Sequence, residues 1–192
     1  MSERLFIAIE LSIAVAEQLM ELQEEFDDAL SEPGVVRWVH PENIHLTLKY
    51  LGQVDGALIE LLEERLRALV SPLFPFQTEC KRMEGSPGKE DASILWACLD
   101  KQSGEVLGLL RRALEQELEK IGIPYDERPF KPRLMLGRAR DGKNQALLET
   151  LERFEDRGFG ASTIKDLVLF AVTQDADGVN YRVVNRFLLG EN

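Results

Sequence analysis

One order of secondary-structure elements occurs twice in this chain, and it restricts the fold more than any other feature of the sequence. A short apolar strand, an amphipathic helix, an irregular segment and a strand with alternating polar residues follow one another in residues 5–52 and again in residues 94–138. A duplicated unit of this kind would bring its two final strands together about a pseudo-two-fold axis. His45 and Arg133 would then lie across one groove.

The length and composition fit a single domain over residues 1–192. The 192 residues are 44% hydrophobic, which is enough to bury a core. We expect an edge strand at 75–83 and an exposed loop at 84–91, because the latter contains two glycines and a proline. The other strands are expected at 5–9, 35–39, 44–51, 93–99, 130–138, 164–172 and 181–188, a turn at 175–178, and helices at 15–30, 58–69, 107–121 and 147–154.

The stretch 44–52 carries the clearest chemical signal. In a strand, alternation would turn His45, Thr47 and Lys49 to one face. The imidazole and the hydroxyl would be roughly 6.5 to 7 Å apart along the backbone, which suits two groups that contact one phosphate. The opposite face, which we expect to point into the core, consists of Ile44, Leu46, Leu48 and Tyr50.

The net charge of −11 argues against a protein that coats long nucleic acid, duplex included. Such binding neutralises many phosphates with Lys and Arg. A site for one terminal phosphate needs only a local positive patch, which an acidic exterior can surround. The charge therefore leaves short anionic substrates open.

Two cysteines, Cys80 and Cys98, fit no metal-binding spacing, and we expect reduced, buried thiols. No apolar run reaches the roughly 18 residues of a membrane span, and the first residues lack the order of a secretory signal. The sequence therefore predicts a cytoplasmic protein without membrane contact.

Two sets of residues resemble known motifs. The first is Arg37-Trp38-Val39, Pro41-Glu42-Asn43 and His45-x-Thr47, followed by Leu51-Gly52, and the second is Phe130-x-Pro132 with Leu134 and Leu136-Gly137-Arg138. They are similar to the 2H phosphoesterases, and within them to the bacterial and archaeal 2'-5' RNA ligase-like proteins, also described as RNA 2',3'-cyclic phosphodiesterases. The resemblance covers nearly the whole chain.

The resemblance implies an α/β (α+β), bilobal fold in which two mainly antiparallel sheets line a central groove and the helices lie outside. It implies neither metal nor cofactor, and two histidines that act as acid and base on a cyclic phosphate. His45 matches the proton donor, and Thr47 holds phosphate. In the second motif this chain has Arg133 and Met135 where the family has His and Thr.

Arginine cannot act as a base, because its pKa above about 12 keeps it protonated. Losing a general base typically costs on the order of 10²- to 10⁴-fold in rate, whereas phosphate binding can survive. The Arg133 guanidinium would match two phosphate oxygens, and Met135 would contact a ribose or base. Arg133 could equally be a strand residue paired with a carboxylate. His40, in a loop, is not expected to replace the missing base.

Arg138 and Lys49 are further candidates for contact with substrate, and a solvated or acid-paired role fits each about as well. We expect a monomer that binds an RNA end or nucleotide with a 2',3'-cyclic phosphate or 2'-phosphate and hydrolyses it weakly, if at all. A non-catalytic phosphate-binding module and a vestigial scaffold with a protein partner remain the alternatives.

Overall fold

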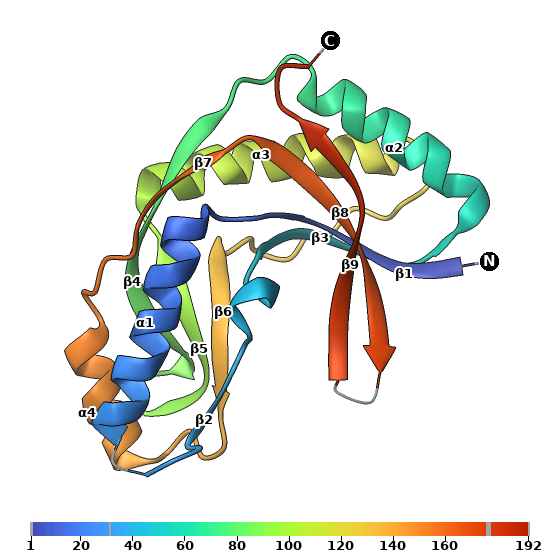
Figure 1. Ribbon diagram of the computed structural model, residues 1–192. Helices are drawn as coiled ribbons and strands as arrows, with labels where there is room; N and C mark the ends of the chain where they lie inside the picture. Colours follow the sequence, from blue (N-terminus) through green and yellow to red (C-terminus); the bar gives the residue numbers. More distant parts are fainter. Residues whose placement is uncertain (1, 31, 176–177, 192) are drawn as a thin grey trace.

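The computed structural model describes residues 2–30, 32–175 and 178–191. Its four-stranded sheet runs in the order β3-β1-β8-β9, and all three neighbouring pairs are antiparallel. Figure 1 shows the β8–β9 hairpin projecting beyond the rest of this sheet. The strands are β1 (Ser2–Ile9), β3 (Leu46–Asp55), β8 (Asp166–Asp175) and β9 (Gly178–Leu188).

The five-stranded sheet runs in the order β2-β6-β5-β4-β7 and is also antiparallel throughout. The strand β3 contacts β6, so the final strands of the two expected repeats adjoin. Whether they reflect a duplication remains a prediction. The strands are β2 (Val36–Trp38), β4 (Phe76–Gly88), β5 (Asp91–Leu99), β6 (Arg133–Ala139) and β7 (Gly160–Ile164).

The helices form at the apolar spacings that the sequence shows. They are α1 (Ile13–Leu30), α2 (Gly56–Val70), α3 (Lys101–Glu119) and α4 (Gln145–Phe154), with a single 3₁₀ turn, η1 (Pro41–Asn43), among the described residues. Side chains cap three of them at the N-terminus: Asp55 for α2, Asp100 for α3 and Asn144 for α4. Contacts pair α1 with α4 and α2 with α3, on the outside of the sheets (Figure 1).

Three expectations about strands are wrong. β4 is an interior strand, because β7 pairs with it along its outer edge. The expected loop at 84–91 instead continues β4 to Gly88 and opens β5 at Asp91. The strand expected at 130–138 begins only at Arg133. The turn expected at 175–178 centres on residues 176–177, which lie outside the described residues.

One core cluster joins both sheets to the helices, and a smaller one lies on the other face of the four-stranded sheet. The expected α+β fold of two antiparallel sheets with external helices is confirmed. Cys80 and Cys98 are both buried and free, as expected. In the described residues, no helix is long and apolar enough to cross a membrane.

Candidate functional site

The four-stranded sheet has one face against the helices and one face turned away from them, which we call its open face. Along β1, Leu5, Ile7 and Ile9 join the main core. Phe6 and Ala8 point to the open face, because successive side chains of a strand alternate. There they form an aromatic and apolar floor with Val168 and Phe170, against which Val172 and Tyr181 pack.

His45 lies on this floor, immediately before β3 begins. Its ring stacks on Phe6, with centroids 4.8 Å apart, and meets Tyr181 edge-on at 5.0 Å. The main-chain carbonyl of Asn43 lies 2.8 Å from Nδ1. Since a carbonyl only accepts hydrogen bonds, Nδ1 carries a proton, and Nε2 is the nitrogen left for a ligand.

The surroundings of His45 favour the neutral imidazole. Burial among the rings lowers its pKa below the ordinary 6.5, and this outweighs the hydrogen bond from Nδ1 to Asn43 and the charge of Glu10, which raise it. A neutral imidazole with a proton on Nδ1 presents a lone pair at Nε2. A bound anion would shift the balance back toward the charged form.

A β-bulge in β3 decides which side chains join His45. Ala8 is opposite Thr47, but Ile7 is opposite Lys49, so the strand carries one extra residue at Leu48. Past the bulge the alternation inverts. Thr47 is on the open face, and Tyr50, opposite Phe6, is there too and is 64% exposed. The expectation that Tyr50 faces the core is therefore wrong.

The same inversion turns Lys49 into the protein, where it is only 5% exposed. Its Nζ donates to Glu115 Oε2 and to the Pro124 carbonyl, both at 2.6 Å. The expectation that Lys49 shares the His45 face and contacts phosphate is wrong, because its charge is already used inside the molecule.

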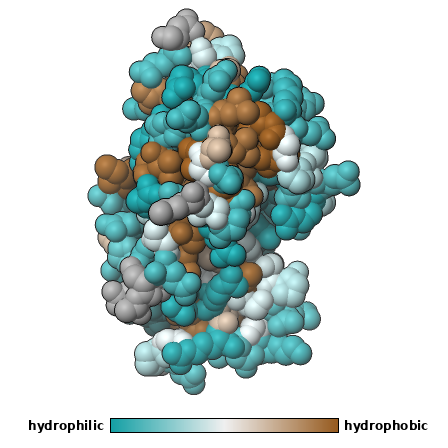
Figure 2. Space-filling model, turned by 90° about the vertical axis from the view of Figure 1, so that its right-hand side faces the viewer, coloured by the Kyte–Doolittle hydropathy of each residue, from teal (hydrophilic) through white to brown (hydrophobic). Residues whose placement is uncertain are grey.

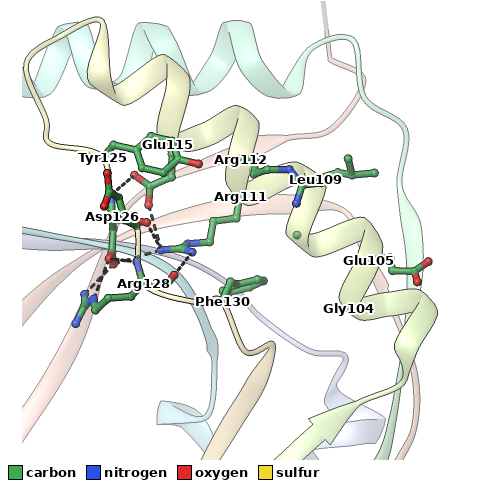
Figure 3. Close-up of a pocket in the computed structure, with 12 residues that line it drawn as sticks. Gly104, Glu105, Leu109, Arg111, Arg112, Glu115, Tyr125, Asp126, Arg128 and Phe130 are labelled. Carbon is green, nitrogen blue, oxygen red and sulfur yellow. Dashed lines mark hydrogen bonds and ion pairs between the residues drawn. The ribbon is translucent and has the colours of Figure 1, made fainter.

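Lys49 belongs to a buried ion cluster that joins β3, α3 and the segment after α3. Figure 3 shows the part of this cluster that Arg111, Glu115 and Asp126 form. Arg111 lies 3.4 Å from Glu115 and 3.2 Å from Asp126, and its Nε donates to the carbonyl of the bulge residue Leu48 at 3.2 Å. Charged hydrogen bonds from Arg128 and the charge of Arg111 hold the pKa of the Asp126 carboxyl well below its usual range. The cluster therefore fixes the bulge from the helix side.

The five-stranded sheet also has an open face, and its character is cationic. Arg133 and Met135 lie opposite Cys98 and Trp96 of β5, so both project to this face. The Arg133 guanidinium lies over the Trp96 ring, 3.8 Å from its centroid. Among the described residues Arg133 forms no ion pair, so the reading in which a carboxylate neutralises it does not fit.

Arg138 lies further along β6, exposed on the same face and directly opposite Arg37 of β2. Like charges opposite one another destabilise a sheet, so an anion is the natural partner for this pair. The charge of Arg138 also reaches the other sheet, since it counteracts the rise that burial causes in the pKa of Tyr181. The two open faces therefore lie within electrostatic range of each other.

The structure thus places His45 and Thr47 on one open face and Arg133, Met135 and Arg138 on the other. The sequence did not point to Tyr181, although it stands in an expected strand, or to Trp96. No sequence signal marks the bulge that exposes Tyr50. His40 is exposed beside Glu42, as expected of a loop residue.

Two cavities lie away from these faces. One, of about 490 Å³, lies along α3 and the segment after it (Figure 3) and includes Arg111, Arg112 and Tyr125. The other, of about 350 Å³, lies between α1 and α4. Within the described residues, no three His, Cys, Asp or Glu side chains gather as a metal ion would require. The candidate site lies outside both of these cavities. Figure 2 shows hydrophobic patches within the hydrophilic surface of one side of the molecule.

Comparison with known proteins agrees with these motifs. Residues 9–96 match the family model of LigT-like phosphoesterases. An RNA 2',3'-cyclic phosphodiesterase of Thermotoga maritima is 30% identical over 78% of both chains, and that of Aquifex aeolicus is 25% identical over 97% of both.

Solved structures share the fold across the whole chain. TT0787 of Thermus thermophilus superposes with a TM-score of 0.79 at 23% identity, covering 98% of this chain and 99% of that one. Escherichia coli LigT complexed with 3'-AMP superposes with a TM-score of 0.78 at 21% identity, covering 100% of both. The chain belongs to the LigT-like phosphoesterase family of the 2H superfamily, as an RNA 2',3'-cyclic phosphodiesterase-like member.

Proposed function

We propose that the two open faces together bind the 2',3'-cyclic phosphate or 2'-phosphate at the end of an RNA or nucleotide, and that hydrolysis of the cyclic ester is weak. In its charged form, which a bound anion favours, His45 donates a proton or hydrogen bond through Nε2, and Thr47 holds a phosphate oxygen. Arg133 and Arg138 supply fixed positive charge, and Met135 contacts the ribose or base. The protein would act as a cytoplasmic monomer.

The observation that carries this proposal is the charge of the site. In a chain of net charge −11, Arg133, Arg138 and Arg37 share one exposed sheet face and form no ion pairs among the described residues. The imidazole of His45 lies on the adjoining sheet with Nε2 unused by its hydrogen bond to Asn43. Such an arrangement suits one small anion with two or three acceptor oxygens.

Relatives support the chemical class. Those from Aquifex aeolicus and Thermotoga maritima bear the name RNA 2',3'-cyclic phosphodiesterase, and Escherichia coli LigT has been solved with 3'-AMP and with phosphate. A nucleotide and phosphate are thus ligands with which this relative has been solved. Whether this chain also hydrolyses a cyclic phosphate depends on the residues in its own site.

Cyclic phosphate hydrolysis needs a base that deprotonates the attacking water and an acid that protonates the departing ribose oxygen. Arg133 stands where the second histidine of the family would be, and it cannot accept the proton of water. The lowered pKa of His45 also leaves less of its acid form at neutral pH. Binding and charge stabilisation persist, while proton transfer is impaired.

A titration with a nucleoside 2',3'-cyclic phosphate tests the binding. Arg133→Ala removes a charged hydrogen-bond donor, which is worth about 1.5 to 3 kcal/mol, so its Kd should rise roughly 10- to 150-fold. Arg112→Ala, at the distant cavity along α3, is the control and should bind as the wild type does. Equal affinities of all three proteins, or no binding by the wild type at millimolar ligand, would contradict the proposal.

A second measurement distinguishes a weak enzyme from a protein that only binds its ligand. It compares the rate at which the wild type and His45→Ala open the ring of the nucleoside 2',3'-cyclic phosphate. A residual rate that depends on His45 identifies an enzyme with an impaired base. Tight binding with no rate above that of His45→Ala identifies the binding module, and the scaffold reading predicts neither.

A further inference from the structure

The open face of the four-stranded sheet has a feature that phosphate binding does not use. Two tyrosines, Tyr50 and Tyr181, accompany His45 there. We propose that their rings form a clamp for the nucleoside part of the ligand, contacting its base and ribose while the phosphate lies against His45 and Arg133. The inference rests on the proposed function and adds to it the means by which a nucleoside is distinguished from a bare phosphate.

Tyr50 is built into the site by the bulge. Without the extra residue at Leu48, the alternation of β3 would bury Tyr50 and expose Lys49. With it, the Tyr50 ring lies 5.8 Å from Phe6, and its hydroxyl accepts a hydrogen bond from Thr47 at 3.4 Å. Most of the ring stays exposed, so one of its faces is open to a ligand. This face lies beside Thr47, the residue proposed to hold a phosphate oxygen.

Tyr181 stands at right angles to the floor. Its ring meets His45 at 89° and Phe6 at 79°, with centroids 5.0 and 5.1 Å away. Its phenol lies within the electrostatic range of both Tyr50 and Arg138. Both tyrosines thus contact Phe6 of the floor that carries His45, and Tyr181 is also near the cationic face.

The chemistry of this surface fits a nucleoside better than a second phosphate. Around His45 the open face holds aromatic and aliphatic groups, including the part-exposed Val183. Arg186, opposite Val168 on this sheet, is already paired with Glu10 and Asp166, whereas Arg133, Arg138 and Arg37, which form no ion pair among the described residues, lie on the other sheet. Tyrosine rings stack on bases of any kind, and their hydroxyls can bond to base edges or ribose hydroxyls. A phosphate between the sheets leaves its attached nucleoside next to these rings.

The buried cluster gives the clamp its rigidity. Arg111 bonds the carbonyl of Leu48, and Glu115 holds Lys49 on the helix side, so the backbone just before Tyr50 is tied at two points. A stacking residue on a fixed strand loses little freedom when its ligand binds. Tyr125, another part-exposed tyrosine, lies away from this face and lines the cavity along α3.

Two ligands test the clamp: a nucleoside 2',3'-cyclic phosphate and glycerol 1,2-cyclic phosphate, which has the ring phosphate without base or ribose. Binding of both is followed by the NMR shifts of the His45 imidazole. The wild type should prefer the nucleoside ligand. Tyr50→Leu should weaken nucleoside binding by about 5- to 150-fold and leave the glycerol ligand unchanged. Tyr125→Leu, the matched control, should change neither.

The variants keep the test decisive if one of them folds poorly. Tyr50→Phe retains the ring and should lose little nucleoside affinity, whereas Tyr181→Leu should repeat the effect of Tyr50→Leu at the other ring. Equal wild-type affinity for both ligands overturns the clamp and leaves the proposed function intact. Failure of the wild type to bind either ligand overturns both proposals.

Discussion

The buried ion cluster behind β3 makes a quantitative prediction about stability. Replacing Glu115→Gln would remove the carboxylate that accepts from Lys49 at 2.6 Å and from the Asp126 main-chain nitrogen at 3.1 Å. The side chains of Lys49 and Glu115 are 4% and 1% exposed, so the ammonium left behind would have no water to replace its partner. The Pro124 carbonyl and the amide oxygen of the new glutamine would be the acceptors left, and neither carries a charge.

Removing one partner of a buried ion pair typically costs about 3 to 5 kcal/mol. For a domain of this size, each 1 kcal/mol lowers Tm by roughly 2 to 4 °C, so Tm should fall by roughly 6 to 20 °C. Lys49→Met should cost less, because Glu115 would keep its contacts with Arg111 and Asp126. The double variant should cost less than the sum of the two, by about 0.5 to 3 kcal/mol.

The measurement is the free energy of unfolding from urea titrations of the three variants. Lys101→Met is the control, since its partner Glu105 is 3.8 Å away and both side chains are mostly exposed. It should change stability by no more than about 0.5 kcal/mol. A Glu115→Gln cost below about 1 kcal/mol would mean that Lys49 has access to solvent and that the bulge is not fixed from within, contrary to this prediction.

Three further predictions concern pH, thiol reactivity and packing. The pKa of His45 is lower in the folded protein than its ordinary 6.5, so between these two pKa values the unfolded chain binds more protons than the folded one. Stability should therefore fall as the pH drops below about 6.5. Urea titrations at about pH 7.5 and 5.5 measure this fall, which His45→Gln should lessen. Burial raises the pKa of the Cys98 thiol to about 12 and that of the Cys80 thiol further. Neither thiol should therefore react with iodoacetamide at about pH 8 until urea unfolds the protein. Rapid labelling of the native protein would contradict the burial of the two thiols. In Gly137→Ala, the new Cβ would lie 2.7 Å from a Val36 methyl and 3.1 Å from the Arg37 carbonyl, so about 1 to 3 kcal/mol of stability should be lost, and an unchanged Tm would show that β2 can move.

Local patterns were enough to place all four helices and the strand that follows His45. Apolar spacing located all four helices, because each buries one stripe against a sheet. Local patterns did not predict that β4 is an interior strand. Its outer neighbour β7 is the short strand Gly-Ala-Ser-Thr-Ile, in which small residues dominate and no apolar alternation indicates a strand. Whether a strand lies at an edge depends on partners far away in the sequence.

The site shows the same division. His45 and Thr47 stand out in the sequence, yet the bulge that separates Thr47 from Lys49 does not. It is held by Arg111 and Glu115, which lie 63 and 66 positions further along the chain than the residues they bond. The floor under His45 likewise comes from β1, β8 and β9 together. Alternation predicts a face only while the ladder stays regular.

We propose that this site retains its phosphate contacts and one histidine but lacks the second proton-transfer group. Arg133→His/Met135→Thr tests it most directly, by the rate of ring opening of a nucleoside 2',3'-cyclic phosphate. We predict a rate on the order of 10²- to 10⁴-fold above that of the wild type, and the loss of this gain when His45→Ala is added. A folded double variant that binds the ligand but opens the ring no faster than the wild type would contradict the claim.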